Sequence, residues 1–190
     1  MASSRRDELL DGVMGMIAER GFSDVRMADI AGELHCSLAS LYKIAPNKDS
    51  LVVLAITRWG DMALADGEAS ARRAATAADR ARRYYQAAAK NVEPLSHAFR
   101  RDVERFESTR LAYKTISDRF VHRFAELISE AEHAGEIRHI NARFLAGMFL
   151  YIAASIRDED LLDAAGITAG EALMQIDEII WGGLDLCHDR

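Results

Sequence analysis

Proline and cysteine are both scarce in this sequence, and each scarcity narrows the possible folds. Only two of the 190 residues are proline, Pro46 and Pro94, whereas alanine is abundant, and this balance favours helix over sheet. The two cysteines, Cys36 and Cys187, stand far apart and form no CxxC pair, which is typical of a reduced intracellular chain rather than of a disulfide framework. No segment alternates apolar and polar residues in the way that a half-buried strand does. We therefore expect an all-α protein.

Long apolar runs and an excess of positive charge are missing as well. The longest nearly apolar run, Phe144–Ile156, is too short to span a bilayer, and the N-terminus carries charge where a signal peptide is apolar. These features predict a cytoplasmic protein with no membrane partner. The chain has 24 Lys and Arg against 30 Asp and Glu, a net charge of −6. Because no basic domain is present, an argument for DNA binding must rest on a motif and a few well-placed cations.

Helical periodicity runs along nearly the whole chain and predicts about nine helices. Gly21 is placed to end the first helix, Asn47 to cap the fourth and Gly135 to stop the seventh. No internal repeat or low-complexity linker interrupts the pattern. The expected helices cover Arg5–Glu19, Met27–Leu34, Ser37–Ile44, a long stretch from Lys48, Ala78–Val92, Pro94–Phe106, Thr109–Ala134, Asn141–Arg157 and Thr168–Cys187.

Two of the short expected helices, Met27–Leu34 and Ser37–Ile44, have the spacing of a helix-turn-helix, with His35-Cys36-Ser37 as the turn. The motif needs apolar anchors on both helices, a small residue where they cross, an apolar residue in the turn and an N-cap on the second helix. Those places are filled by Ile30, Leu34, Leu41, Ile44, Ala31, Cys36 and Ser37. The second helix would enter the major groove of DNA with its exposed face. That face carries Leu38, Ala39, Ser40, Tyr42 and Lys43.

The stretch from Arg6 to Leu51 resembles the DNA-binding domain of the tetracycline-repressor (TetR/AcrR) family. The shared features are a glycine-aromatic pair after the first helix, an Ile-Ala pair in the second, a serine before the third, a Leu-Tyr pair within it and a Lys-acidic-x-Leu opening of the fourth. In this chain they are Gly21-Phe22, Ile30-Ala31, Ser37, Leu41-Tyr42 and Lys48-Asp49-x-Leu51. The resemblance implies a helix-turn-helix DNA-binding domain over residues 1–47 and a helical ligand-binding and dimerisation domain over residues 48–190.

The resemblance also implies how the chain would contact double-stranded operator DNA. Tyr42 and Lys48 would touch phosphates, and Arg26, which stands where the family has Ser or Thr, could grip another. The base-facing residues offer few hydrogen-bonding groups, so base reading would depend on thymine methyl groups, Lys43 and DNA shape. His35 replaces the family's turn glycine at a position that we expect to need a positive φ. The expected DNA-binding set is Arg26, Ser37, Leu38, Ala39, Ser40, Tyr42, Lys43 and Lys48.

A cavity between the middle helices, for a small and largely apolar effector, is a further implication of the resemblance. Tyr84, Tyr113 and His97 would be its polar groups. From the sequence alone, each aromatic or methionine residue of these helices can equally belong to the hydrophobic core. The candidates for the lining are Trp59, Met62, Tyr84, Phe99, Phe106, Tyr113, Phe120 and Met148.

The last two expected helices are more apolar than one small domain needs to cover its core. We expect them to pair with their copies in a two-fold four-helix interface, which makes the protein a homodimer. The expected interface residues are Phe144, Phe149, Ile152, Ile176, Ile180 and Leu184.

The sequence gives less support to a metal site than to DNA binding. Glu130-x-x-His133 and Glu136-x-x-His139 match the short motif of di-iron helical bundles. In such bundles the two copies lie on facing helices, whereas here only a few residues separate them, so coincidence is the favoured interpretation. We expect no metal and no cofactor.

Catalysis has no candidate group, because no catalytic triad, nucleophile elbow or phosphate-binding glycine loop is present. The leading hypothesis is a ligand-responsive repressor, and the alternative is a helical protein-interaction adaptor that kept the fold without DNA binding. A cluster of arginines is expected to form a solvated helix face rather than a second nucleic-acid surface. Its members are Arg72, Arg73, Arg80, Arg82 and Arg83.

Overall fold

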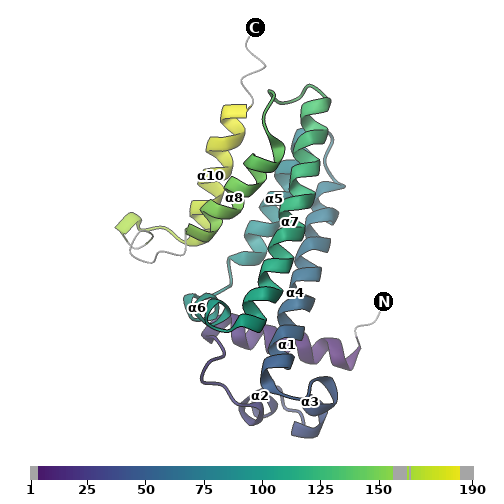
Figure 1. Cartoon of the computed structure of the whole chain (residues 1–190), viewed down its shortest axis with the longest axis vertical. Coiled ribbons are helices and arrows are strands. Elements are labelled where there is room, and N and C mark those ends of the chain that lie inside the picture. Colours follow the sequence, from purple (N-terminus) through teal and green to yellow (C-terminus); the bar gives the residue numbers. More distant parts are fainter. Residues whose placement is uncertain (1–3, 156–161, 163, 185–190) are drawn as a thin grey trace. The chain divides into compact units, whose positions relative to one another are not determined.

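The structure is a computed structural model that describes residues 4–155, 162 and 164–184. Within these residues every regular element is an α-helix, and nine helices are defined (Figure 1). The all-α prediction is therefore confirmed. None of these helices is both long and apolar enough to cross a membrane. They are α1 (Arg5–Arg20), α2 (Met27–Glu33), α3 (Leu38–Ile44), α4 (Lys48–Ala71), α5 (Ala77–Val92), α6 (His97–Arg105), α7 (Glu107–His133), α8 (Ala142–Ser155) and α10 (Ala169–Leu184).

The chain folds into two compact units, and neither is a single stretch of sequence. The first unit consists of Met1–Met62 and Pro94–Ile116, and the second of Ala63–Glu93 and Ser117–Arg190. α4 and α7 each give one part to each unit, whereas α6 belongs wholly to the first. The division of functions at residue 47 stays a prediction, because compactness does not show what a unit binds.

Residues with a positive φ end or separate the helices where the sequence predicts it. Gly21 follows α1 with φ 78° and Gly135 follows α7 with φ 72°. His35, in the turn between α2 and α3, has φ 48°, and it is the one described residue other than glycine in this region of φ. The expected backbone conformation of the turn is confirmed, and His35 adopts it without the freedom of glycine.

Side-chain caps begin α3 and α4. The Ser37 hydroxyl accepts a hydrogen bond from the Ser40 amide at 3.1 Å, and the Asn47 side-chain oxygen accepts one from the Ser50 amide at 2.8 Å. Both expected caps are confirmed, and each satisfies a backbone donor that a helix start leaves unpaired.

The start of α6 differs from the expectation. The helix begins at His97 rather than at Pro94, because the Ser96 hydroxyl accepts a hydrogen bond from the Phe99 amide at 3.2 Å and so caps it. Pro94 is the expected first helical residue, but the Ser96 hydroxyl provides the stronger N-cap. The expected ends of the last two long helices, at Arg157 and Cys187, lie outside the described residues.

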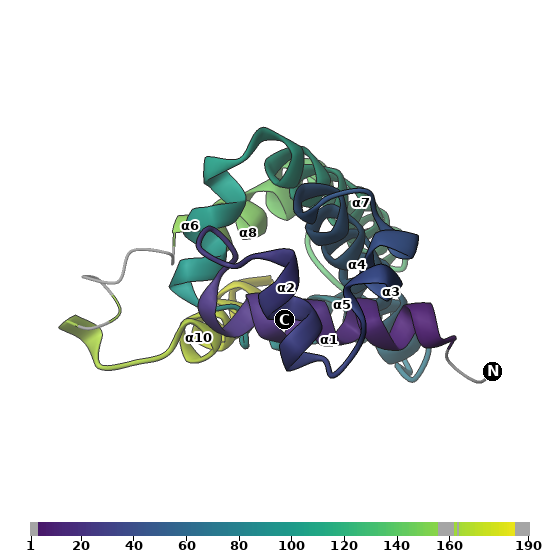
Figure 2. The ribbon, with the colours of Figure 1, turned by 90° about the horizontal axis from the view of Figure 1, so that it is seen from below.

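The core of the first unit forms around α1. Leu10, Val13 and Ile17 are buried and recur at helical spacing along one face. α6 packs against α1, and α2 packs against α3. Figure 2 shows α2 and α3 as two short helices that meet at a tight turn. This packing leaves one face of α3 uncovered.

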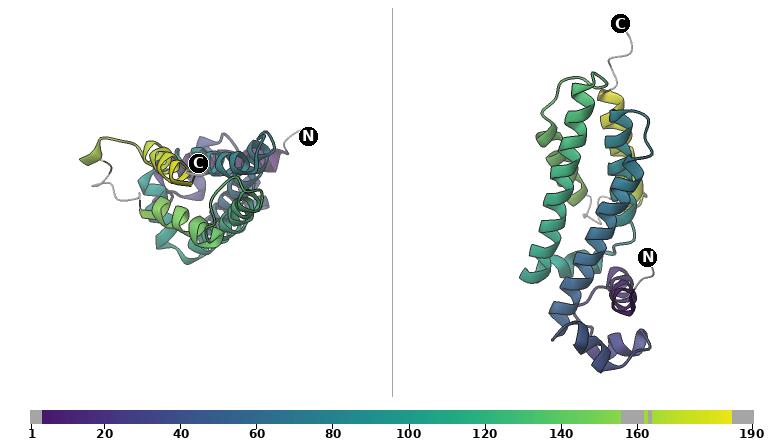
Figure 3. Two further views of the ribbon diagram at one scale, coloured as in Figure 1. Left: turned by 90° about the horizontal axis from the view of Figure 1, so that it is seen from above. Right: turned by 90° about the vertical axis from the view of Figure 1, so that its right-hand side faces the viewer.

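The core of the second unit is rich in aromatic residues and alanine. α10 packs against α5, and the left view of Figure 3 looks nearly along these two helices and along α7 and α8. Phe124 is fully buried, with Tyr85 at 5.8 Å and Phe149 at 5.2 Å between ring centroids. The core also contains Ala81, Tyr84, Leu127, Ile128, Ala131, Leu145, Ala146, Leu173, Trp181 and Leu184.

Candidate nucleic-acid interface

The turn between α2 and α3 has the geometry of a helix-turn-helix. Ile30 and Leu41 are fully buried, one from each helix, so they anchor the pair from inside. The Cys36 amide donates a hydrogen bond to the Ala31 carbonyl at 3.0 Å, which closes the turn. Cys36 itself is half-buried and has a free thiol. The short second helix is thereby fixed relative to the first.

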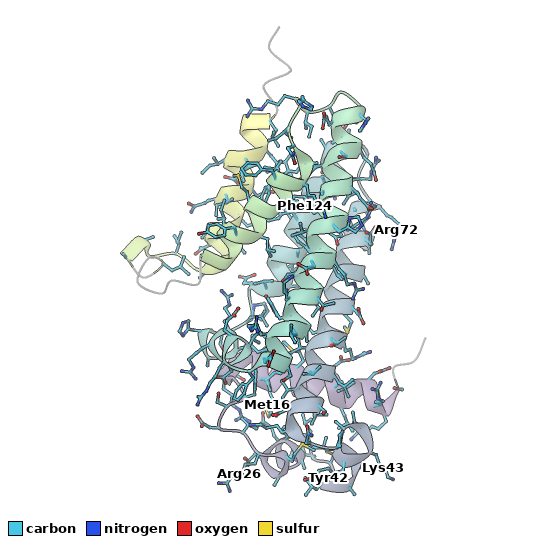
Figure 4. All side chains as sticks on the ribbon, viewed as in Figure 1. Met16, Arg26, Tyr42, Lys43, Arg72 and Phe124 are labelled. Atoms are coloured by element: carbon cyan, nitrogen blue, oxygen red, sulfur yellow. The ribbon has the colours of Figure 1, made fainter. Side chains whose placement is uncertain are left out.

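The outer face of α3 is exposed as the motif requires. Leu38 and Tyr42 are among the exposed large apolar side chains, and Ala39 and Lys43 are exposed beside them. Figure 4 shows Tyr42 and Lys43 pointing outward from α3, with Arg26 outward from the start of α2. The hydroxyls of Ser37 and Ser40 lie 2.8 Å apart, so the cap of the helix partly occupies them. Methyl groups, a phenol and one ammonium therefore dominate this face.

The start of α2 leaves the predicted phosphate-contacting side chain on the surface. Asp29 caps this helix by accepting a hydrogen bond from the Arg26 amide at 2.8 Å, and the Arg26 side chain is exposed. At the other end of α2, Glu33 is paired with Arg20 of α1. This ion pair neutralises one carboxylate of α2, although the first 50 residues contain eight acidic and six basic residues.

Lys48 occupies a place that the sequence analysis did not foresee. Its ammonium donates hydrogen bonds to the carbonyls of Phe22 at 2.9 Å and Ser23 at 3.2 Å, and the residue is half-buried. The predicted phosphate contact of Lys48 thus competes with two bonds inside the protein.

Asp102 of α6 is a buried carboxylate that the sequence analysis missed. It is 1% exposed, and one carboxylate oxygen accepts hydrogen bonds from the Phe22 amide at 2.7 Å and the Ser23 amide at 2.8 Å. Burial alone would raise the pKa of Asp102, but the hydrogen bonds from Ser23 and Phe22 outweigh it and hold that pKa below its usual value. A signal was present in the sequence, because Asp102 falls on the apolar stripe that includes Phe99 and Val103.

The residues expected to line a ligand cavity are divided between the two units. Trp59, Met62, Phe99, Phe106 and Tyr113 belong to the first unit, and Tyr84, Phe120 and Met148 to the second. A lining role for the whole set stays a prediction.

Within the first unit, these residues differ in environment. Phe99 and Phe106 pack against Phe22, with ring centroids 6.3 and 5.7 Å away, so they hold α6 to the end of α1. Trp59 of α4 stacks on Tyr113 of α7 at 6.0 Å, and both are half-buried.

In the second unit, Tyr84 is the centre of the aromatic cluster. It is fully buried and stacks on Phe120 at 5.3 Å and on Phe124 at 6.4 Å. Burial, with the nearby carboxylate of Glu68, raises the pKa of Tyr84 to about 12, so its hydroxyl stays protonated at neutral pH. Figure 4 labels Phe124, which belongs to the same cluster. The cluster can serve as core or as the wall of a cavity, and its polar group is a neutral hydroxyl.

A buried polar group joins α10 to α5, and the sequence analysis missed it. Asp177 is fully buried, and one of its oxygens accepts hydrogen bonds from Arg82 and Gln86, each at 2.9 Å. Its other oxygen and the indole nitrogen of Trp181 have no hydrogen-bond partner among the described residues. Arg82 therefore belongs to an internal ion pair, and Arg80 and Arg83 pair with Glu130 and Asp79. The arginine cluster is in part a set of structural ion pairs.

The expected dimer helices expose apolar residues, but not all of those named in advance. Phe149 and Leu184 are buried within their own chain, so neither can contact a second subunit directly without a rearrangement. The side chains that do reach outward are Phe144, 63% exposed, Tyr151, 75% exposed, and Ile179, 74% exposed. Ile152, Ile176 and Ile180 are half-buried. Which residues face a partner depends on how each helix is rotated about its axis, and the sequence pattern does not give that rotation.

The di-iron pattern is not assembled in the described residues. His133 contacts the carbonyl oxygen of Ser129 at 2.6 Å, and Glu136 accepts a hydrogen bond from the Ala78 amide at 2.7 Å. No cluster of three or more His, Cys, Asp or Glu side chains in this part of the chain could hold a metal ion.

A unit that contains a helix-turn-helix, together with a larger helical unit, is the architecture of a class of bacterial transcriptional regulators. No family model matches the chain, and no curated protein matches it. Solved structures do match the chain, and the three described next share no more than 22% sequence identity with it.

A regulator from Saccharomonospora viridis, in complex with choline, has a TM-score of 0.77 and 21% identity over 94% of this chain and 96% of its own. A TetR-family regulator from Rhodococcus has a TM-score of 0.74 and 21% identity over 93% of this chain and 98% of its own. The ketosteroid transcriptional regulator of Mycobacterium tuberculosis has a TM-score of 0.62 and 22% identity over 97% of both chains. The chain therefore has the fold of TetR-family transcriptional regulators.

Proposed function

We propose that this protein is a DNA-binding transcriptional regulator that reads operator DNA with the outer face of α3. The observation that carries the proposal is the pairing of a buried anchor, Leu41, with exposed Leu38, Tyr42 and Lys43 on one seven-residue helix. A helix held in this way can enter the major groove without losing its own packing. The fold of regulators from several bacteria supports the same function.

The test begins with the selection of bound fragments from random double-stranded DNA. Titration of the selected operator then compares Tyr42→Ala with Lys43→Ala. Tyr42→Ala should weaken binding to all sequences alike, since phosphate contacts position the protein without reading sequence, whereas Lys43→Ala should change the sequence preference. Lys90→Ala, on an exposed position of α5, is the matched control and should bind as the wild type does. Absence of any selected DNA would favour the protein-interaction adaptor instead.

We also propose that a small effector releases the protein from its operator. The observation behind this is the aromatic cluster of the second unit, because aromatic rings suit an apolar molecule and can also bind a quaternary ammonium such as choline, the ligand of the Saccharomonospora viridis regulator. Release requires that the effector bind one of two states better, typically with about 1–3 kcal/mol of coupling, which corresponds to a loss of roughly 5- to 150-fold in operator affinity. Choline and a steroid are reasonable first compounds, tested for their affinity with and without saturating operator. Equal affinities in the two conditions would contradict a regulatory role for the compound.

A homodimer formed through α8 and α10 is the third part of the proposal. Phe144 and Tyr151 lie seven residues apart, on one face of α8, and Ile179 is the most exposed apolar residue of α10. Exposed apolar groups of this size on two neighbouring helices indicate a surface that a partner covers. Tyr151→Glu and Ile179→Glu should yield monomers in sedimentation at micromolar concentration, whereas Leu111→Glu, at an exposed position of α7, should not. A monomeric wild type would contradict the proposal.

A further inference from the structure

Phe22 and Ser23, which come directly after Gly21 at the end of α1, are hydrogen-bonded to an anion on one side and to a cation on the other. The amides of Phe22 and Ser23 donate to Asp102 at 2.7 and 2.8 Å, and their carbonyls accept from Lys48 at 2.9 and 3.2 Å. The peptide group between Phe22 and Ser23 takes part at both ends, because its N–H points to the carboxylate and its C=O to the ammonium. The dipole of this peptide group is thus aligned between an anion on α6 and a cation on α4.

Burial and close contact show that this arrangement is built into the core of the unit. Asp102 is 1% exposed, and its buried charge is stabilised by the two amides and by the guanidinium of Arg101, which lies 3.4 Å from its other oxygen. Gly21 lies directly against it, since a Cβ at that position would stand 2.6 Å from the carboxylate oxygen, and its φ is 78°. The neighbouring Ser96 amide donates to the Ala18 carbonyl at 2.8 Å, which fastens the start of α6 to the last turn of α1.

The held segment leads directly into the predicted DNA-contacting surface. Three residues after Ser23 comes Arg26, whose exposed side chain stands at the start of α2. α2 in turn packs on α3, the helix proposed to enter the groove. The position of the Phe22–Ser23 peptide therefore sets where α2 begins.

We propose that Lys48 is a positioning residue, which acts with Asp102 through the Phe22–Ser23 peptide to place α2, and that it is not a phosphate ligand. The inference rests on the proposed DNA-binding function. It departs from the role that the family resemblance implies for Lys48, because two of the three N–H donors of its ammonium are already bound to carbonyls. Phosphate contact is left to side chains that point outward, such as Arg26 and Tyr42.

The first experiment measures the salt dependence of operator binding, with the operator selected from random DNA. Loss of a phosphate-binding lysine lowers the slope of log affinity against log salt by about 1. Lys48→Met should instead weaken binding at every salt concentration and leave the slope as in the wild type. Lys48→Gln, which removes the charge but keeps an N–H donor, should retain more affinity than Lys48→Met, again with the wild-type slope. A slope lowered by about 1 in either variant would overturn the proposal.

The second experiment follows hydrogen exchange of the Phe22 and Ser23 amides in the protein without DNA. Lys48→Met and Asp102→Asn should each accelerate exchange at these amides by at least about tenfold, because each removes a bond to a charged group. Lys43→Met, which removes an exposed charge from the same unit, should leave them unchanged. Wild-type exchange rates in Lys48→Met would overturn the proposal.

The two experiments separate the inference from the function on which it rests. If the wild type selects no DNA, the proposed function fails, and the exchange measurement still decides whether Lys48 and Asp102 act on one peptide. If DNA is bound and the slope falls in Lys48→Met, the function stands and the positioning role fails. Should Lys48→Met unfold, Lys48→Gln provides both measurements.

Discussion

Gly67 of α4 is a position where one added methyl group should destabilise the second unit. A Cβ there would lie 2.8 Å from two ring carbons of Tyr84, whereas ordinary van der Waals contact begins near 3.4 Å. The ring has little room to retreat, because it is fully buried and stacks on Phe120 and Phe124. Gly67 therefore allows α4 and α5 to approach closely.

The expected size of the effect follows from two opposing contributions. Overpacking of a core typically costs about 1–3 kcal/mol, and alanine in a helix interior recovers up to about 1 kcal/mol relative to glycine. Gly67→Ala should thus lower the free energy of unfolding by about 1 kcal/mol, which lowers the Tm by about 2–4 °C for a chain of this length.

Gly15→Ala in α1 is the matched control, because a Cβ at Gly15 would meet no atom within 4 Å. That variant should raise the free energy of unfolding by about 0.5–1 kcal/mol. Urea denaturation at one fixed protein concentration compares the two, since dimerisation makes the apparent stability depend on concentration. If Gly67→Ala raised the stability as Gly15→Ala does, the close packing of α4 on the Tyr84 ring would be refuted.

Three further predictions concern groups with unusual surroundings. Arg82→Ala should lower the free energy of unfolding by about 3 kcal/mol, because it leaves the fully buried carboxylate of Asp177 without its counter-charge. Asp177→Ala should cost less, because the Arg82 side chain is 39% exposed and can turn to water. Equal losses in urea denaturation would contradict this order. His35→Gly should raise the free energy of unfolding by up to about 1 kcal/mol, because φ at this position is 48°, and a lower melting temperature would count against strain in the turn. The pKa of Asp102 is lower in the folded chain than its usual 3.8, so the stability it contributes is complete above that value and is lost as the pH falls through the folded-state pKa. The urea midpoint of the wild type should therefore fall more steeply below about pH 4 than that of Asp102→Asn, and parallel pH profiles would show that the carboxylate is not stabilised in this way.

The agreement between sequence and structure is best where the signal is local. The N-caps at Ser37 and Asn47, the helix end at Gly21 and the turn at His35 each depend on residues no more than four positions away. For the same reason the helix-turn-helix was predicted in detail, since its anchors, cap and turn fall within one short segment. The start of α6 was misplaced because two local signals, Pro94 and Ser96, compete there and the stronger cap prevails.

The sequence by itself determined the helical class, the position of α3 and its exposed face, because apolar spacing and capping act over single turns. Only the tertiary structure decided what the charged groups do. Asp102 lies 80 residues from Phe22, and Asp177 lies 95 residues from Arg82, so neither pairing leaves a pattern that a window of the sequence can show. The partners of Lys48 are equally hidden from the sequence. The lysine matches a family motif that implies phosphate contact, whereas its ammonium is bound to two carbonyls of the loop after α1. A charged side chain takes the partners that packing brings within about 3 Å, and the partners of Asp102, Asp177 and Lys48 come from segments that are distant in sequence.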